Sequence, residues 1–224
     1  MLDAIEARRI PVGAVVGTSS GALAGALWAA GHPAGKVAEI LSSRTPFSYM
    51  GAHAAVWQGL FSMAPVIETL RALLPPTFAD LPRPFAVGVA GPGGRHALLS
   101  AGDLPAAVAA SCAMPVIFAP VEHGGVRWRD GGAVDRLGLG AWREWRGPRP
   151  VIVHRVARSA GVDAADDLGG AILIETPRSG ASFWSLGDFG AQRAEARSRA
   201  LAALGAVAGE EGGVAGETLV SPAL

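Results

Sequence analysis

A charge-free stretch near the N-terminus constrains the fold more than any other feature. From Pro11 to Gly35 there is no Asp, Glu, Lys or Arg, so these residues belong in a protein core or a bilayer. Glycines recur there every four residues, as in packed membrane helices, but Leu, Ile and Phe are too few for strong insertion. We therefore predict a buried strand at Val12–Val16, a tight turn at Gly17–Gly21 and a helix at Ala22–Ala30, with a membrane helix as the alternative.

The remaining sequence alternates between strand and helix patterns. Apolar or alternating runs predict strands at 85–90, 96–100, 126–128, 151–156 and 171–175. Residues 1–9 resemble the end of a helix, and helical patterns also occur at 34–43, 65–74, 104–112 and 189–204. This order predicts an α/β fold in which helices cover both faces of one sheet. We assign residues 1–205 to one domain and expect the Gly-rich C-terminal tail, 206–224, to be loosely held.

Bulk composition narrows the possible functions. The 224 residues are 50% hydrophobic and 17% charged, with a formal net charge of zero, which indicates a globular domain without the basic surface that nucleic acid requires. Cys112 is the only cysteine, so no internal disulfide or cysteine-based metal site can form. We predict no metal and no cofactor, and interpret the acidic residues between 163 and 167 as a solvated loop.

The N-terminal residues give no indication of export. Met1 is followed by Asp3, Glu6, Arg8 and Arg9 without an intervening apolar core, a pattern unlike a signal peptide. With no signal peptide and no transmembrane helix predicted, we expect a cytoplasmic protein with at most peripheral contact with a membrane.

The turn between the predicted strand and helix carries the first chemical motif. Gly17–Gly21 reads G-T-S-S-G and fits the pattern G-x-S-x-G, in which the central Ser lies on a sharp turn that only small neighbours permit. Ser19 is therefore the candidate nucleophile. The residues beside it in this turn are Gly17, Thr18, Ser20 and Gly21. The alternatives are an ordinary turn or a phosphate-binding loop, although the latter would need a Lys that is absent here.

A serine nucleophile needs a base. The five histidines are His32, His53, His96, His123 and His154. His154 lies in an apolar strand after Asp130, so a Ser-Asp-His triad is one possible arrangement. Asp130 itself is the other candidate, because it follows a short predicted strand directly; an Asp before two glycines is also a common turn. A free Asp has a pKa near 3.9, so direct catalysis by Asp130 would require close contact with Ser19 and exclusion of water.

Two blocks of sequence together resemble the patatin-like phospholipase family. The first reads V-V-G-T-S-S-G-A-L at Val15–Leu23 and continues to A-A-G at Ala29–Gly31. The second reads A-S-C-A-M-P-V-I-F-A-P at Ala110–Pro120, followed by W-R-D-G-G-A-V-D at Trp128–Asp135. The resemblance implies a three-layer α/β sandwich with a mostly parallel sheet.

The resemblance also implies an activity. In that family the G-x-S-x-G serine and the Asp of the D-G-G motif form a dyad without histidine, which places Ser19 and Asp130 in these roles, with Gly131 and Gly132 completing the motif. The implied reaction is carboxyl-ester hydrolysis of phospholipids or other acyl-ester lipids through an acyl-enzyme, as in a phospholipase A or lysophospholipase.

The chain departs from the family pattern at two places. The family normally has a strand and a Gly-rich oxyanion loop before the serine, whereas no such motif precedes Ser19 here, so we expect an N-terminally truncated member. Gly91–Arg95 is superficially similar but lies between two predicted strands, which predicts a hairpin turn. The second departure is Arg136–Gly138, where the family often has an Asn-Pro pair.

Other functions stay open at this level. A chain without the oxyanion loop could be an inactive lipid- or protein-binding remnant, and a triad with His154 could serve a small-ester hydrolase. The aromatic segment Phe47–Phe61 is a candidate cap or membrane-facing segment, with core packing as the alternative. The sequence does not specify acyl-chain length, head group, positional specificity or oligomeric state.

Overall fold

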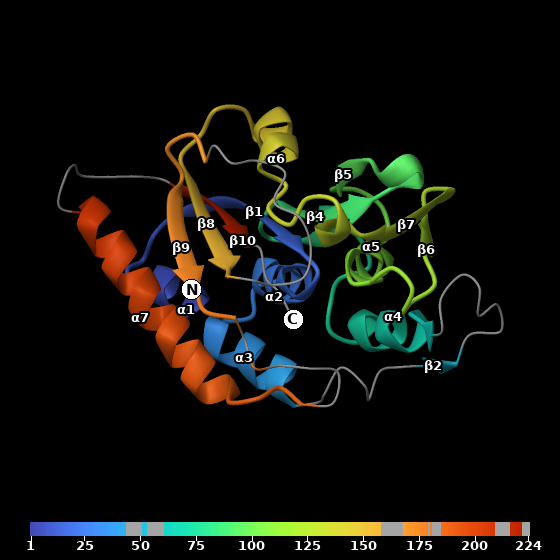
Figure 1. Ribbon diagram of the computed structural model, residues 1–224, viewed down its shortest axis with the longest axis horizontal. Coiled ribbons are helices and arrows are strands. Elements are labelled where there is room, and N and C mark those ends of the chain that lie inside the picture. The colour runs from blue at the N-terminus through green and yellow to red at the C-terminus, as the bar shows by residue number, and fades with distance from the viewer. Residues whose placement is uncertain are drawn as a thin grey trace.

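A computed structural model describes residues 1–43, 51–52, 61–157, 168–178, 180, 185–208 and 216–220 (Figure 1). Its α-helices are α1 (Leu2–Ala7), α2 (Ser20–Ala29), α3 (Ala34–Ser42), α4 (Ala64–Arg71), α5 (Leu104–Ser111), α6 (Leu139–Arg146) and α7 (Phe189–Ala208). The larger sheet contains β1 (Val12–Thr18), β4 (Phe85–Ala90), β5 (His96–Leu99), β6 (Val121–His123), β7 (Val126–Asp130), β8 (Val151–Val156), β9 (Ile172–Thr176) and β10 (Gly216–Val220). A separate pair consists of β2 (Gly51–Ala52) and β3 (Phe61–Ser62).

The large sheet is mixed, with a parallel centre. Its strand order is β6-β7-β4-β1-β10-β8-β9, and β5 also pairs with β4. Strands β4, β1, β10, β8 and β9 are parallel to their neighbours in this series, whereas β5, β6 and β7 pair antiparallel. The predicted α/β class with a mostly parallel centre is therefore confirmed.

The apolar strands of the sequence are buried on both sides. Along β1, Val15 belongs to a cluster that includes residues of α2 and α5, whereas Ala14 and Val16 belong to a second cluster with Leu139 and Trp142 of α6. Successive side chains of a strand point to opposite faces, so these two clusters lie on opposite sides of the sheet. This explains why β1 is continuously apolar and does not alternate.

The helices at one end of the sheet are joined by polar contacts. Glu6 Oε1 accepts hydrogen bonds from Trp28 Nε1 at 2.8 Å and from the Ala34 N–H at 2.9 Å, so it links α1 to α2 and α3. Asp3 and Arg193 form a two-pronged ion pair between α1 and α7, with Arg193 Nε 2.9 Å from Asp3 Oδ2. In Figure 1, α7 runs along the outside of β9 with α1 and α3 beside it.

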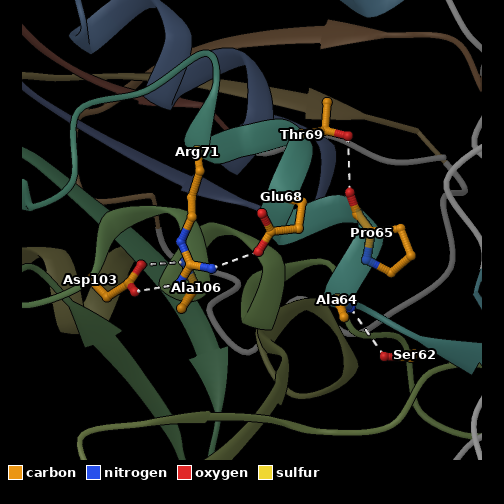
Figure 2. A network of polar contacts seen from close by, with 8 residues as sticks. All are labelled: Ser62, Ala64, Pro65, Glu68, Thr69, Arg71, Asp103 and Ala106. Carbon is orange, nitrogen blue, oxygen red and sulfur yellow. Dashed lines mark hydrogen bonds and ion pairs between the residues drawn. The ribbon is translucent and has the colours of Figure 1, made fainter.

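A second polar network fixes the start of α5 (Figure 2). Asp103 caps this helix, because its Oδ1 accepts a hydrogen bond from the Ala106 N–H at 2.9 Å. Arg71, at the end of α4, donates to Glu68 at 2.8 Å and to the other oxygen of Asp103 at 3.1 Å. All eight residues of α5 are buried, so the network sets the position of a helix whose far end reaches the candidate nucleophile.

Most of the predicted elements are confirmed. The strand, turn and helix predicted near the N-terminus are β1, the turn after it and α2, so this segment does not form a single membrane helix. The predicted hairpin turn at Gly91–Arg95 joins the antiparallel strands β4 and β5. In the described part of the chain, no helix combines the length and apolar character needed to cross a bilayer.

Several elements were not predicted from the sequence, namely helix α6 and strands β2, β3, β6 and β10. The expectation of a loosely held tail is wrong for Gly216–Val220, because this segment forms β10 and pairs in parallel with β1 and β8. The segment is short and flanked by glycines, so its sequence did not indicate a strand. Helix α6 was also missed, although Leu139 and Trp142 are three residues apart on one face. Of the aromatic segment Phe47–Phe61, only Phe61 and the backbone of 51–52 are described, and the acidic cluster at 163–167 lies outside the described residues.

Candidate active site

A sharp turn joins β1 to α2 and presents Ser19. This residue has φ 56° and ψ −125°, a left-handed conformation that non-glycine residues adopt only when the surroundings enforce it. Gly17 makes the turn possible, since a Cβ at this position would lie 2.2 Å from the Gly21 carbonyl oxygen and 2.6 Å from the Ala22 nitrogen. The G-x-S-x-G pattern thus has a steric origin: the strand and the first turn of the helix touch at Gly17.

Both backbone polar groups of Ser19 are held from the end of α5. The Ser19 N–H donates to Ser111 Oγ at 3.0 Å, and that hydroxyl donates to the Gly88 carbonyl at 2.7 Å. The next residue, Cys112, donates its thiol hydrogen to the Ser19 carbonyl at 3.2 Å. Burial, with a smaller contribution from the charge of Asp130, raises the pKa of Cys112, so this thiol stays protonated. The strained backbone of Ser19 is therefore fixed on both sides.

The sheet register brings Asp130 toward Ser19. Thr18, the last residue of β1, pairs with Gly88 of β4, and the next residue of β4, Val89, pairs with Asp130 of β7. Ser19 and Asp130 therefore lie at the same edge of the sheet, near the carboxyl end of β4 and on either side of that strand.

Gly131 allows the chain after Asp130 to lie against β4. A Cβ at Gly131 would be 2.5 Å from the Gly88 carbonyl carbon and 2.7 Å from the Val89 nitrogen. The Gly132 N–H then donates to Asp130 Oδ1 at 2.8 Å, which caps the short 3-10 helix η5 (Gly131–Ala133). The D-G-G motif is thus a close-packed turn that orients the carboxylate.

The Asp130 carboxyl group has an unusual protonation equilibrium. Only 4% of the residue is exposed. Burial raises the pKa of Asp130 to about 6, although hydrogen bonds from the Ser19 side chain and from the Gly132 N–H oppose the shift. A carboxylate with a pKa near 6 is a much better base at neutral pH than an ordinary Asp. Burial of Asp130 therefore makes its carboxylate more basic than that of a free Asp.

The arrangement with His154 as base is contradicted by the strand order. Asp130 lies on β7 and His154 on β8, with β4, β1 and β10 between them, which separates the two strands by roughly 19 Å at about 4.8 Å per strand. His154 Nε2 contacts Thr176 Oγ1 at 3.1 Å. Burial, with a smaller effect of the positive N-terminus, lowers the pKa of His154 to about 4. A Ser-Asp-His triad on these residues cannot form.

The other described histidines have different neighbours, although His96 approaches the end of β1: its Nε2 would lie 3.0 Å from a Cβ at Gly88, a position that also contacts Thr18. The His32 ring lies 3.4 Å from the Leu73 carbonyl, and the His123 carbonyl accepts a hydrogen bond from Trp128. Burial lowers the pKa of His96, and the charge of Asp135 opposes this effect. His53 lies outside the described residues. Among the residues that the structure describes, no three His, Cys, Asp or Glu side chains are grouped as metal ligands.

Comparison with known families gives a match that includes both motifs. A family model for the patatin-like phospholipase domain matches residues 1–141. The chain belongs to the patatin-like phospholipase family. The match spans α1 to the start of α6, so Ser19 and Asp130 are inside it, whereas β8, β9, α7 and β10 follow it. The resemblance in the two sequence blocks is confirmed, and membership suggests lipid acyl hydrolase activity on lipid substrates.

The second departure from the family pattern has a local structural explanation. In this patatin-like domain, Asp135 Oδ1 accepts hydrogen bonds from the Leu137 and Gly138 N–H groups, each at 3.0 Å. Gly138 has φ 63°, a left-handed conformation that suits glycine, and α6 begins at the next residue. Asp135 therefore shapes the loop after the D-G-G turn.

Three residues that support the site were not singled out from the sequence. Ser111 and Cys112 hold the backbone of Ser19, and Gly88 leaves room beside Thr18, whose Oγ1 would be 2.4 Å from a Cβ there. Ser111 and Cys112 do lie in the block Ala110–Pro120 that carries the family resemblance, which was the available signal. Ser111 and Cys112 lie 92 and 93 positions after Ser19 in the chain. Contacts between such distant segments cannot be predicted from spacing along the chain.

We expect Ser111→Ala to slow hydrolysis without weakening binding of a soluble ester. Loss of the hydroxyl leaves the Ser19 N–H and the Gly88 carbonyl without their partner, at a cost of about 1–3 kcal/mol for each buried group. A nucleophile that shifts by a fraction of an ångström loses roughly 10- to 100-fold in rate. Steady-state kinetics on p-nitrophenyl butyrate should therefore show a lower kcat with KM unchanged.

Two further variants separate positioning from general stability. Ser111→Cys keeps a weak donor and acceptor and should recover part of kcat. Thr77→Ala removes a hydroxyl that bonds Asp80 Oδ2 at 2.7 Å in an exposed capping box, so it should cost stability and leave kcat unchanged. Equal losses of kcat in Ser111→Ala and Thr77→Ala would show that Ser111 has no specific role.

Proposed function

We propose that this chain is a serine acyl hydrolase that cleaves lipid carboxyl esters, with Ser19 as the nucleophile and Asp130 as its base. The observation that carries the proposal is the register of β1, β4 and β7, which brings the buried carboxyl group of Asp130 to the Ser19 turn. The raised pKa of this carboxyl group, about 6, supports its role as a base. The family match supports the lipid substrate class.

Acylation would proceed by proton transfer within this pair. Asp130 takes the proton of the Ser19 hydroxyl while Ser19 Oγ forms a bond to the ester carbonyl carbon. The tetrahedral intermediate collapses when the bond to the alcohol oxygen breaks, and Asp130 returns the proton to the departing alcohol. The products of this half-reaction are the free alcohol, here a lysolipid or glycerol derivative, and an acyl ester of Ser19.

Deacylation would repeat the same steps with water. Asp130 accepts a proton from a water molecule, whose oxygen attacks the acyl carbonyl carbon. The bond to Ser19 Oγ then breaks, the serine regains its proton and a fatty acid is released. One Asp side chain therefore serves as base and acid in both halves of the reaction.

The helix after the nucleophile supports the negative charge that develops on the carbonyl oxygen. The Ser19 carbonyl accepts from the N–H groups of Ala22 and Leu23, so those of Ser20 and Gly21 in the first turn have no acceptor within α2. They lie at the positive end of the helix, beside the reacting carbonyl. The Ser19 N–H itself is occupied by Ser111 and does not contribute.

The proposal has two further parts. Helices cover both faces of the sheet in a three-layer arrangement, supported by the buried clusters on opposite sides of β1. The protein also contacts membranes peripherally, since phospholipid substrates are held in bilayers, and its partners do not include nucleic acid.

The pH dependence of hydrolysis tests the assignment of the base. Asp130 must be ionised to accept the Ser19 proton, so kcat/KM for a soluble ester should rise tenfold per pH unit below a pKa of about 6 and level off above it. The measurement is p-nitrophenyl butyrate hydrolysis between pH 4.5 and 8, with fatty-acid release from phosphatidylcholine vesicles confirming the substrate class. A rate that stays constant from pH 4.5 to 7 would rule out Asp130 as the base.

A further inference from the structure

Two polar side-chain atoms approach the same point over β4, directly beside the nucleophile turn. Thr18 and Gly88 are paired residues of β1 and β4. A Cβ at Gly88 would lie 2.4 Å from Thr18 Oγ1 and 3.0 Å from Nε2 of His96, the first residue of β5. The missing side chain at Gly88 therefore lets Thr18 and His96 approach each other from the two neighbouring strands.

Neither of these atoms has a hydrogen-bond partner among the residues that the structure describes. Thr18 is 2% exposed, and His96 is partly buried with its Nε2 atom shielded from solvent. Buried polar groups are nearly always paired, because an unpaired one keeps the full cost of its lost hydration. Each group here supplies what the other lacks, since a hydroxyl donates a hydrogen and a neutral imidazole has one nitrogen that accepts.

His96 also contacts the loop that follows the D-G-G turn. A Cβ at Gly138 would lie 3.0 Å from His96 Cε1, and Asp135 holds this loop through the Leu137 and Gly138 N–H groups. Burial lowers the pKa of His96, an effect that the charge of Asp135 opposes, so the ring is mainly neutral at physiological pH. The imidazole thus lies between the end of β1 and the loop after the candidate base.

The Thr18 side chain faces both halves of the candidate site. Its methyl carbon Cγ2 would lie 3.8 Å from a Cβ at Gly132, whose N–H group binds Asp130 Oδ1. Its hydroxyl oxygen is on the side of His96. Because Ser19 follows directly with a strained backbone, a shift of Thr18 also shifts the nucleophile.

We propose that His96 is a positioning residue for the nucleophile: its Nε2 accepts a hydrogen bond from the Thr18 hydroxyl and thereby fixes the residue from which Ser19 turns. A small rotation of the two side chains closes this bond over Gly88. The inference rests on the proposed function for its reaction and adds a residue that touches neither the substrate nor the reacting atoms. No proton of the reaction passes through His96, so its role differs from that of a triad histidine.

Matched substitutions at Thr18 separate the hydrogen bond from packing. Thr18→Val keeps the branched shape and removes the hydroxyl, whereas Thr18→Ser keeps the hydroxyl and removes the methyl group. We expect Thr18→Val to lower kcat for p-nitrophenyl butyrate about tenfold with KM unchanged, because the nucleophile is less well placed. Thr18→Ser should retain most of kcat. His96→Ala should match Thr18→Val, and His96→Gln, whose amide oxygen can accept the bond, should recover part of the loss.

His123 provides the control for removing a histidine. Its Nε2 is also buried without a partner in the described part of the chain, but it lies 3.1 Å from a Cβ position at Gly102 and does not face Thr18. His123→Ala should therefore leave kcat unchanged. The double variant Thr18→Val/His96→Ala should lose no more than either single variant, as expected for partners in one bond. Additive losses, or equal losses in His96→Ala and His123→Ala, would overturn the inference.

A second readout requires no turnover and uses Ser19→Ala protein. The nitrogen NMR chemical shift of His96 Nε2 responds to a hydrogen bond that this atom accepts, so it should move in Thr18→Val and stay nearly constant in Thr18→Ser. The same shift in the parent and in Thr18→Val would show that the bond does not form and would overturn the inference. A shift that moves in Thr18→Val, in a protein whose Ser19 form lacks esterase activity, would uphold the bond and refute the proposed hydrolase function.

Discussion

Replacing Asp130 with Asn is expected to abolish hydrolysis while making the protein more stable at neutral pH. Asn cannot accept the Ser19 proton, so kcat/KM for p-nitrophenyl butyrate should fall roughly 10³-fold or more, toward the level of Ser19→Ala. The amide oxygen can still accept the Gly132 N–H that now binds Asp130 Oδ1. The local turn should therefore persist, and loss of activity would not reflect loss of structure.

The gain in stability follows from the direction of the pKa shift. The pKa of Asp130 rises from 3.8 to about 6 in the folded state because the group is buried. Between these values the folded chain binds more protons than the unfolded chain, so stability falls as pH rises through this window. At pH 7 the ionised carboxylate costs about 3 kcal/mol relative to a group without a shift, and the neutral Asn avoids this cost.

Thermal unfolding at two pH values checks this explanation. Asp130→Asn should unfold at a higher temperature than the parent chain at pH 7, and the difference should shrink near pH 4. Labelling with a fluorophosphonate should modify Ser19 in the parent chain and be much reduced in Asp130→Asn. Full activity in Asp130→Asn combined with loss of activity in His154→Ala would instead restore the histidine as the base.

The sequence led to the two candidate residues but not to the contacts that support them. G-x-S-x-G and D-G-G point to Ser19 and Asp130 as candidates because each motif is local: the glycines are needed by neighbours a few residues away, or by one strand lying alongside. The raised pKa of Asp130 could not be predicted, since it depends on how completely β4 and β7 bury the carboxyl group. Ser111 was missed for the same reason, because its partners Ser19 and Gly88 come from other segments.

The fold shows the same division between local and long-range information. Strand β1 is apolar up to its last residue and β8 begins with the apolar run Val151–Val153, and such runs predict burial on both faces. The order of the strands is not encoded locally, so β10 could enter between β1 and β8 without any signal in its five residues. That strand also widens the separation of Asp130 and His154 in the sheet. The order of the residues along the chain made a histidine triad plausible, and the order of the strands in the sheet excludes it.

Replacing Gly17 with Ala is expected to be the most destabilising single-methyl change at the site. The added Cβ would lie 2.2 Å from the Gly21 oxygen, 2.4 Å from its carbonyl carbon and 2.6 Å from the Ala22 nitrogen, all backbone atoms that cannot move independently. Relief requires β1 and α2 to separate, at a cost of about 3 kcal/mol or more. Urea denaturation should show a lower midpoint, and hydrolysis should fall because Ser19 moves with α2.

Gly140→Ala is the matched control for this change. Gly140 lies in α6 with open space around its Cβ position, so alanine there should stabilise the helix by about 0.5–1 kcal/mol. The same methyl group thus has opposite effects at two glycines, and the difference measures how tightly β1 and α2 meet. If Gly17→Ala unfolds at the urea concentration of the parent chain, the turn can open without cost. The close contact at Gly17 would then not be what holds Ser19 in its left-handed conformation.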